Sequence, residues 1–274
     1  MSRTFAEYSD VEFSSPLRQG DVLEVVDLGP GESSSLLLVI TADCDLAFNK
    51  NRDLVTCIPI LAKEDYLLTL TAPRIRAQAI RQPVAELQQV LAQCGYANVS
   101  DKRVRQWVAE ADNESIVAEL SLEEPFKGDA IAAIDAMRLI DAPQGTVREF
   151  LDALVEAQMK SKNPPKSDKA RKRVLADLRE PFTRPPGDTL FLGCVAPGLD
   201  AGYFAYLRDP EQIEQSRIAT TPGRADAQYR RISRLKDRFT HALVQRFAMV
   251  FMSIGLPSEY EEIRDLHADF LGET

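Results

Sequence analysis

Apolar residues near the start of the chain occur in three short runs that predict β-strands. The runs cover residues 22–26, 36–40 and 54–60. The second run is continuously apolar, which is typical of a strand buried on both faces. Glycine, proline and asparagine occupy the gaps between the runs, where they favour tight turns. Three neighbouring strands with short connections predict an antiparallel meander.

From about Pro83 the apolar spacing changes to steps of three and four, which predicts helices. Ser100 precedes one of these stretches, as an N-cap residue would. The block ends in the basic segment KSKNPPKSDKARKR, residues 160–173, which predicts a mobile loop running into a helix at 174–178. We expect four or five helices, with the apolar faces Val84/Leu87/Val90/Leu91, Val104/Trp107/Val108, Ile131/Ile134/Met137/Leu139 and Val147/Phe150/Leu151/Leu154/Val155.

Strand-like segments return at 189–198 and 202–210, with a weaker one at 216–221. Strands on both sides of a helical block need pairing partners, and an open sheet edge invites aggregation. The predicted fold class is therefore α+β: a small antiparallel β-barrel interrupted by a long helical insertion and followed by a long C-terminal helix. The predicted parts are 10–62 and 187–222 for the barrel, 63–186 for the insertion and 228–274 for the C-terminal helices.

A long amphipathic helix is predicted near the end of the chain, where Gly255 and Pro257 terminate it. The tail after Pro257 predicts a short helix that is marginal without packing. Cations at the start of a helix are disfavoured by its dipole, so the basic residues there are expected to face an acidic partner or the acidic tail. The apolar face comprises Ile232, Leu235, Phe239, Leu243, Phe247, Val250 and Ile254, and the basic residues are Arg230, Arg231, Arg234, Lys236 and Arg238.

This C-terminal region presents more apolar surface than a small barrel needs, which predicts a partner-docking surface or a homodimer seam. The alternative is that the inserted helices cover it. The candidate partner-binding residues are Arg231, Arg234, Arg238, Phe239, Phe247, Ile263, Leu266 and Phe270.

Composition and charge narrow the possible locations and partners. The 45% hydrophobic and 27% charged residues are ordinary for a folded protein. A net charge of -9 opposes binding of nucleic acid except at a local basic patch. The start lacks the apolar core of a signal peptide, and no apolar run is long enough to span a bilayer. We therefore expect a cytoplasmic protein without a membrane anchor.

The segments RQGDVLEVVDLGPGE, LLLVITADC and LVTCIPI resemble the opening strands of the MazF and PemK toxin barrels. The resemblance implies an SH3-like barrel. An arginine and a threonine or serine placed against the scissile phosphate, which that family would need, cannot be matched here. Ser33, Ser34 and Ser35 stand where a basic residue usually precedes the buried strand. This departure counts against a ribonuclease, because a fold does not transfer chemistry.

ITADCDLAFN and YRRISRLKDRFTHALVQRFAMVFMSIGLP are similar to the "(S/T)xxCD(I/L)" and "FARFFxxxGLP" signatures of a bacterial protein group. That group has no established activity. The way its genes occur resembles that of genes of anti-phage and mobile-element conflict systems. The resemblance implies a setting without implying a mechanism.

The sharpest local motif is Asp43-Cys44-Asp45, at the end of a buried strand. Neighbouring carboxylates raise a thiol pKa, so Cys44 is a poor nucleophile without a nearby base or cation. The interpretation we favour is structural: Cys44 packs as a small apolar residue, and Asp45 caps a turn or the backbone amides of the next segment. If the protein is an enzyme, these three residues are its catalytic candidates. The cysteines at 44, 57, 94 and 194 contain no closely spaced pair, so neither a disulfide framework nor a metal site is expected, and no cofactor.

The basic segment supplies the nucleic-acid-binding candidates, although no aromatic residue is interleaved for base stacking. A solvated linker is the alternative interpretation. These candidates are Lys160, Lys162, Lys166, Lys169, Arg171, Lys172 and Arg173.

Three hypotheses of function follow. The first is a non-catalytic interaction component that assembles with a larger protein, such as an ATPase or nuclease of the same operon, or with a second copy. The second is a barrel ribonuclease of the MazF type. The third is a DNA-binding regulator that acts through the helical block.

Overall fold

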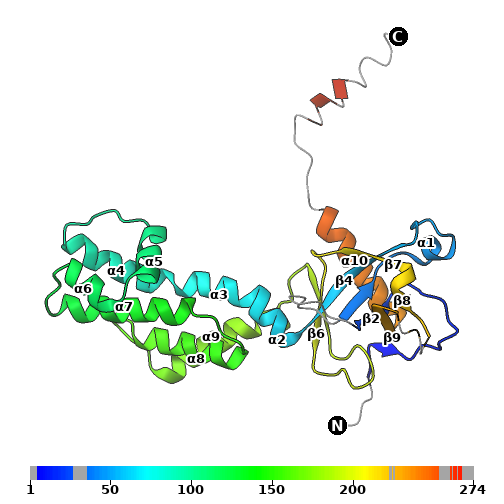
Figure 1. Ribbon diagram of the computed structural model, residues 1–274, viewed down its shortest axis with the longest axis horizontal. Helices are drawn as coiled ribbons and strands as arrows, with labels where there is room; N and C mark the ends of the chain where they lie inside the picture. Colours follow the sequence, from blue (N-terminus) through cyan, green and yellow to red (C-terminus); the bar gives the residue numbers. More distant parts are fainter. Residues whose placement is uncertain are drawn as a thin grey trace. The chain divides into compact units, whose positions relative to one another are not determined.

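The computed structural model describes residues 5–26, 36–221, 224, 226–252, 260, 262–263 and 265–266. The fold is mixed α+β, and the chain divides into two compact units (Figure 1). A sheet unit consists of Met1–Leu61 together with Pro186–Thr274, and a helical unit consists of Ala62–Pro185. Because the two strand-bearing segments lie on either side of the helical unit in the sequence, the sheet joins parts of the chain that are far apart.

The strands form one sheet in the order β1-β9-β2-β3-β4-β6-β5, with β7 paired to β4 and β8 paired to β9. The predicted antiparallel meander is confirmed, since β3 pairs antiparallel with both β2 and β4. Only β8 runs parallel to its neighbour, among the pairings whose direction is described. The strands are β1 (Tyr8–Ser9), β2 (Asp21–Val25), β3 (Leu36–Val39), β4 (Leu54–Ala62), β5 (Thr189–Leu192), β6 (Tyr203–Tyr206), β7 (Glu211–Glu214), β8 (Ile218–Ala219) and β9 (Tyr229–Leu235).

The core lies on both faces of β3, as its continuous apolar run predicts, because all four of its residues are buried. Side chains that face one another across strands point to the same side of a sheet. Leu23 lies opposite Leu37 on one face, where Cys57 and Ile213 join the same apolar cluster. On the other face, Leu38 lies opposite both Val22 and Ile58. Burial of this strand therefore ties the meander to the rest of the unit.

The segment 229–235 is a strand, and the prediction that the last long helix includes Ile232 and Leu235 is wrong. The helix, α10, is Asp237–Met252. Residues 231, 233 and 235 are the buried positions of β9, with a period of two. Arg231 and Ser233 are polar, so hydropathy does not reveal this alternation. The remaining predicted helix residue, Ile254, lies outside the described residues.

The helical unit contains more helices than the four or five predicted. In Figure 1, α7 lies between α4 and α8, and α9 packs against α8. Ser100 is the N-cap of α5 and accepts a hydrogen bond from the Arg103 amide, as predicted. The helices of this unit are α2 (Lys63–Tyr66), α3 (Ala72–Ala79), α4 (Arg81–Gln93), α5 (Asp101–Glu110), α6 (Asn113–Glu119), α7 (Phe126–Asp141), α8 (Val147–Met159) and α9 (Ser167–Thr183), with a π-helical turn at Leu67–Thr71.

The basic segment also differs from its prediction as a loop, because α9 begins at Ser167. Ala170, Val174 and Leu178 are buried along one face of this helix at steps of four. That apolar stripe outweighs the basic residues between its members, which remain on the exposed side. Among the described helices, none is long and apolar enough to cross a membrane.

Candidate functional site

Asp43 is the anchoring residue of the Asp43-Cys44-Asp45 motif, which opens the short helix α1 (Asp43–Ala47). Its carboxylate accepts hydrogen bonds from Arg18 Nη2 at 2.7 Å and from the Gln19 amide at 2.8 Å. These contacts tie α1 to the turn that precedes β2. The sequence did not reveal this pairing, because 25 positions separate Arg18 from Asp43.

The roles predicted for Cys44 and Asp45 are wrong. Cys44 is exposed, so it does not pack as an apolar residue. The Asp45 carboxylate accepts a hydrogen bond from Cys44 Sγ at 3.5 Å, and within the described residues it accepts none from a backbone amide, so it caps neither a turn nor the next segment there. The thiol therefore donates to a carboxylate, an arrangement that does not activate a nucleophile.

We expect Asp43→Ala to lower the free energy of unfolding by about 1 kcal/mol near neutral pH, because it removes charge-assisted hydrogen bonds from a partly exposed site. Asp45→Ala is the matched control, with an expected change within about 0.5 kcal/mol. Urea denaturation of both variants measures this difference. If Asp45→Ala lowers the free energy of unfolding more than Asp43→Ala does, Asp45 and not Asp43 is the stabilising residue of the motif.

The effect of Asp43 depends on pH. Burial alone would raise the pKa of Asp43, but hydrogen bonds from Arg18 and from the Gln19 amide outweigh it and hold the pKa below its ordinary value. A carboxyl with a lowered pKa in the folded state stabilises the fold above its ordinary pKa. That contribution is lost as the pH falls through the lowered pKa. The difference between wild type and Asp43→Ala should therefore vanish in acid.

Two of the predicted partner-binding arginines are used inside the sheet unit. The Asp21 carboxylate is completely buried, and it pairs with Arg231 Nη1 at 3.4 Å and with Arg234 Nη2 at 3.1 Å. The Arg18 amide donates to the same carboxylate at 2.9 Å. The Arg231 side chain is only 2% exposed, so it offers a partner no surface. For Arg231 and Arg234, the prediction that they face an acidic partner or the acidic tail is therefore wrong, because their carboxylate is Asp21 of β2.

Two further candidates, Arg238 and Phe239, contact Phe5 near the start of the chain. The Arg238 guanidinium lies 5.0 Å from the Phe5 ring centroid, and the Phe239 ring meets Phe5 edge-on at 5.9 Å. Thr240 and Leu243 are buried beneath this first half of α10. The first half of the helix is therefore fixed to its own unit.

The second half of α10 is different. Met249 is 63% exposed, Phe251 45% and Met252 79%, while Phe247 lies against Phe251 with ring centroids 4.9 Å apart. Of the candidates in the tail, Ile263 and Leu266 are exposed, and Phe270 lies outside the described residues. The last two turns of α10 therefore carry five large apolar side chains, of which Met249, Phe251 and Met252 are exposed. We call them the α10 end: Phe247, Met249, Val250, Phe251 and Met252.

Ion pairs within the helical unit engage three of the seven basic candidates. Lys160 lies 3.2 Å from Asp135, Lys162 lies 2.9 Å from Asp129, and Arg171 lies 2.8 Å from Asp152. The other four have no ion pair within the described part of the chain: Lys166, Lys169, Lys172 and Arg173. The basic segment is therefore divided between structural ion pairs and unpaired cations.

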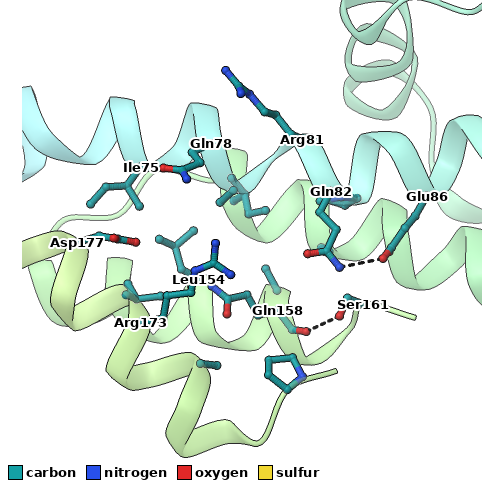
Figure 2. A pocket seen from close by; sticks show the side chains of 18 of the residues that line it. Ile75, Gln78, Arg81, Gln82, Glu86, Leu154, Gln158, Ser161, Arg173 and Asp177 are labelled. Atoms are coloured by element: carbon teal, nitrogen blue, oxygen red, sulfur yellow. Dashed lines mark hydrogen bonds between the residues drawn. The ribbon is translucent and has the colours of Figure 1, made fainter. Parts of the chain in front are cut away.

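Two of the unpaired cations line a cleft of about 660 Å³ between α3, α4, α7, α8 and α9. Its floor is apolar and includes the buried residues Ile75 and Leu154. Figure 2 shows the carboxamide of Gln158 and the guanidinium of Arg173 pointing toward one another over this floor. Arg81 is turned away from it. The cleft thus combines an apolar base with walls that carry polar groups, cations and the carboxylates of Glu86 and Asp177.

The carboxamides of Gln78 and Gln82 extend from the α3–α4 side of the same cleft (Figure 2). Gln82 donates a hydrogen bond to Glu86 at 3.0 Å. The sequence did not single out these glutamines, because the cleft is assembled from residues about 100 positions apart that share no local motif.

Comparisons with protein-family models, with curated proteins and with solved structures found no match for this chain. The fold and the sites therefore define only a class: a mixed α+β protein with an antiparallel sheet unit and a helical unit that carries a cleft.

Proposed function

We propose that this chain is a non-catalytic interaction protein that holds a larger protein partner through the α10 end. The observation that carries the proposal is the exposure of Met249, Phe251 and Met252 on a helix whose first half is firmly anchored. Burying a methionine or phenylalanine side chain contributes about 1.5–3 kcal/mol, so these residues offer substantial binding energy. Methionine also adapts its shape to a partner, and aromatic residues dominate interface energetics.

Charge suggests the chemistry of the partner. The segment after Pro257 carries six acidic residues against one arginine. No basic residue lies in the last turn of α10, whose carbonyl end is the negative end of the helix dipole. We therefore expect the partner to present an apolar pocket with a basic rim.

The wider setting of the proposal rests on the sequence resemblances. An SH3-like barrel would suit a module that displays a helix, and a bacterial cytoplasmic conflict system would supply a larger ATPase or nuclease partner. A MazF-type ribonuclease would need a cation free to contact the scissile phosphate. The arginine beside the motif, Arg18, is instead paired with Asp43. An interaction role requires no such group.

The test of this proposal compares Met249→Asp with Phe48→Asp in the full chain, each purified from the native host with its associated proteins. Phe48 is 74% exposed in the same unit, so its substitution introduces the same charge away from the α10 end. We expect Met249→Asp to lose the partner that wild type and Phe48→Asp retain, with a loss of at least 10-fold in affinity, about 1.4 kcal/mol.

Light scattering of the isolated chain distinguishes a second copy from a different protein. A dimer mass that Met249→Asp abolishes would assign the α10 end to self-association and overturn the partner proposal. A monomer with no variant-sensitive partner would overturn the interaction role. RNA cleavage by the purified chain would favour the ribonuclease alternative.

A further inference from the structure

Lys169 and Arg173 form a pair of cations on one face of α9, because residues four apart are neighbours on a helix. Both line the cleft of the helical unit, and neither has an ion pair within the described residues. Asp177 follows Arg173 by a further four positions, yet the two make no ion pair. The guanidinium instead extends over the cleft floor (Figure 2).

Across the cleft from α9, helix α8 contributes a further polar group. Gln158 of α8 directs its carboxamide toward the Arg173 guanidinium, and no protein group among the described residues bonds that carboxamide. Guanidinium, ammonium and carboxamide groups all donate hydrogen bonds, and a guanidinium binds phosphate oxygens in pairs. Arg173 and Gln158 approach one another in Figure 2, and Lys169 adds a second positive charge to the lining of the same cleft, which favours an anion with several acceptor oxygens.

The rest of the cleft fits an uncharged body attached to that anion. Ile75 and Leu154 form the apolar floor, and Gln78 and Gln82 offer hydrogen-bonding groups beyond it. A volume of about 660 Å³ lies within the range of small-molecule sites, about 300–1,000 Å³. Phosphate alone would fill only a small part of it.

We propose that this cleft binds a small organic phosphate ester. Its phosphate lies between Lys169, Arg173 and Gln158, and its body covers the floor beneath Gln78 and Gln82. A nucleic-acid strand fits less well, since no aromatic residue among the described lining is available to stack on bases, and the net charge of -9 repels a polyanion. The site lies in the helical unit and does not depend on the partner proposed for the α10 end.

Isothermal titration of the full chain at low salt tests the proposal with inorganic phosphate, with two small esters (glycerol phosphate and adenosine monophosphate) and with oligouridine as a nucleic-acid probe. We expect at least one of the two esters to bind more tightly than inorganic phosphate, with a Kd below about 1 mM. Arg173→Glu should weaken that binding by at least about 10-fold, because it replaces an attractive charge with a repulsive one. Lys172→Glu makes the same charge change on an exposed residue of α9 outside the cleft lining, and it should leave binding within about 2-fold.

Two results would overturn the proposal. One is that neither ester binds more tightly than inorganic phosphate. The other is an equal loss of ester affinity in Arg173→Glu and Lys172→Glu, together with tighter binding of oligouridine than of either ester. That result would assign the exposed face of α9 to nucleic acid. Circular dichroism and the urea midpoint establish that each variant is folded, and Arg173→Gln replaces Arg173→Glu if the latter is not.

Discussion

Asp21→Ala is expected to lower the free energy of unfolding of the sheet unit by about 3–5 kcal/mol, because it leaves the buried Arg231 charge without its counter-charge. The carboxylate is fully buried, and Arg231 beside it is 2% exposed. The same carboxylate fixes the Arg18 amide at the entrance to β2. Its loss therefore affects both a buried charge and the register of β2 against β9.

Urea denaturation followed by far-ultraviolet circular dichroism measures this effect. Glu214→Ala is the matched control, because Glu214 forms an exposed ion pair with Arg217 in the same unit. Exposed pairs contribute about 0–1 kcal/mol, so this variant should remain close to wild type. If Asp21→Ala loses no more than Glu214→Ala, the buried cluster does not stabilise the sheet.

Phe150→Ala should produce a comparable loss in the helical unit, about 3–5 kcal/mol, because it empties a large volume in the core. Phe150 is 1% exposed on α8, and the Arg76 guanidinium lies 5.3 Å from its ring centroid. The substitution also removes this aromatic neighbour from Arg76, whose Nε is buried without a hydrogen-bond partner within the described residues.

Tryptophan fluorescence is a selective probe for this variant, since the single tryptophan of the chain, Trp107, lies on α5 of the helical unit. We expect the fluorescence transition to move to lower urea in Phe150→Ala. Phe150→Leu retains most of the side-chain volume and should lose about 1.5 kcal/mol or less. Equal losses in the two variants would show that cavity formation is not the cause.

Strands and helices with regular apolar spacing could be predicted from the sequence. The run at 36–40 indicated β3, and the pattern after Ser100 indicated α5. The spacing of Phe239 and Leu243 indicated the part of the last helix that does form. In each case local hydropathy and the buried face agree.

The sequence failed where burial depends on a distant partner. Arg231 and Ser233 are buried because Asp21 and the Val195 carbonyl accept their hydrogen bonds. Neither partner is visible in the local pattern of 229–235, so that pattern predicts the start of a helix where the structure has a strand. The edge strand β7 was missed for a related reason, since Ile213 is its only buried residue.

The cleft cannot be predicted from the sequence, because its lining residues come together only when several helices pack against one another. Lys169 and Arg173 were recognised as basic residues, but their prediction as part of a loop concealed that they share a helix face. Gln158 lies on α8, whose apolar spacing predicts only which face of the helix is buried. Their convergence requires the side-by-side arrangement of α8 and α9.

The position of β9 between β1 and β2 also determines the order in which the sheet can form during synthesis. During synthesis, β2, β3 and β4 leave the ribosome long before β9, and the whole helical unit lies between them in the sequence. At about 5–20 residues per second, the 174 residues from Ala62 to Leu235 take about 9–35 s to make. During that interval the helical unit, whose sequence is continuous, can complete its core. The edge of β2 that pairs with β9 stays unpaired until β9 has been synthesised. A nascent chain stalled within this window would expose that edge to other chains, so we expect a chaperone to reduce aggregation of chains that end before β9.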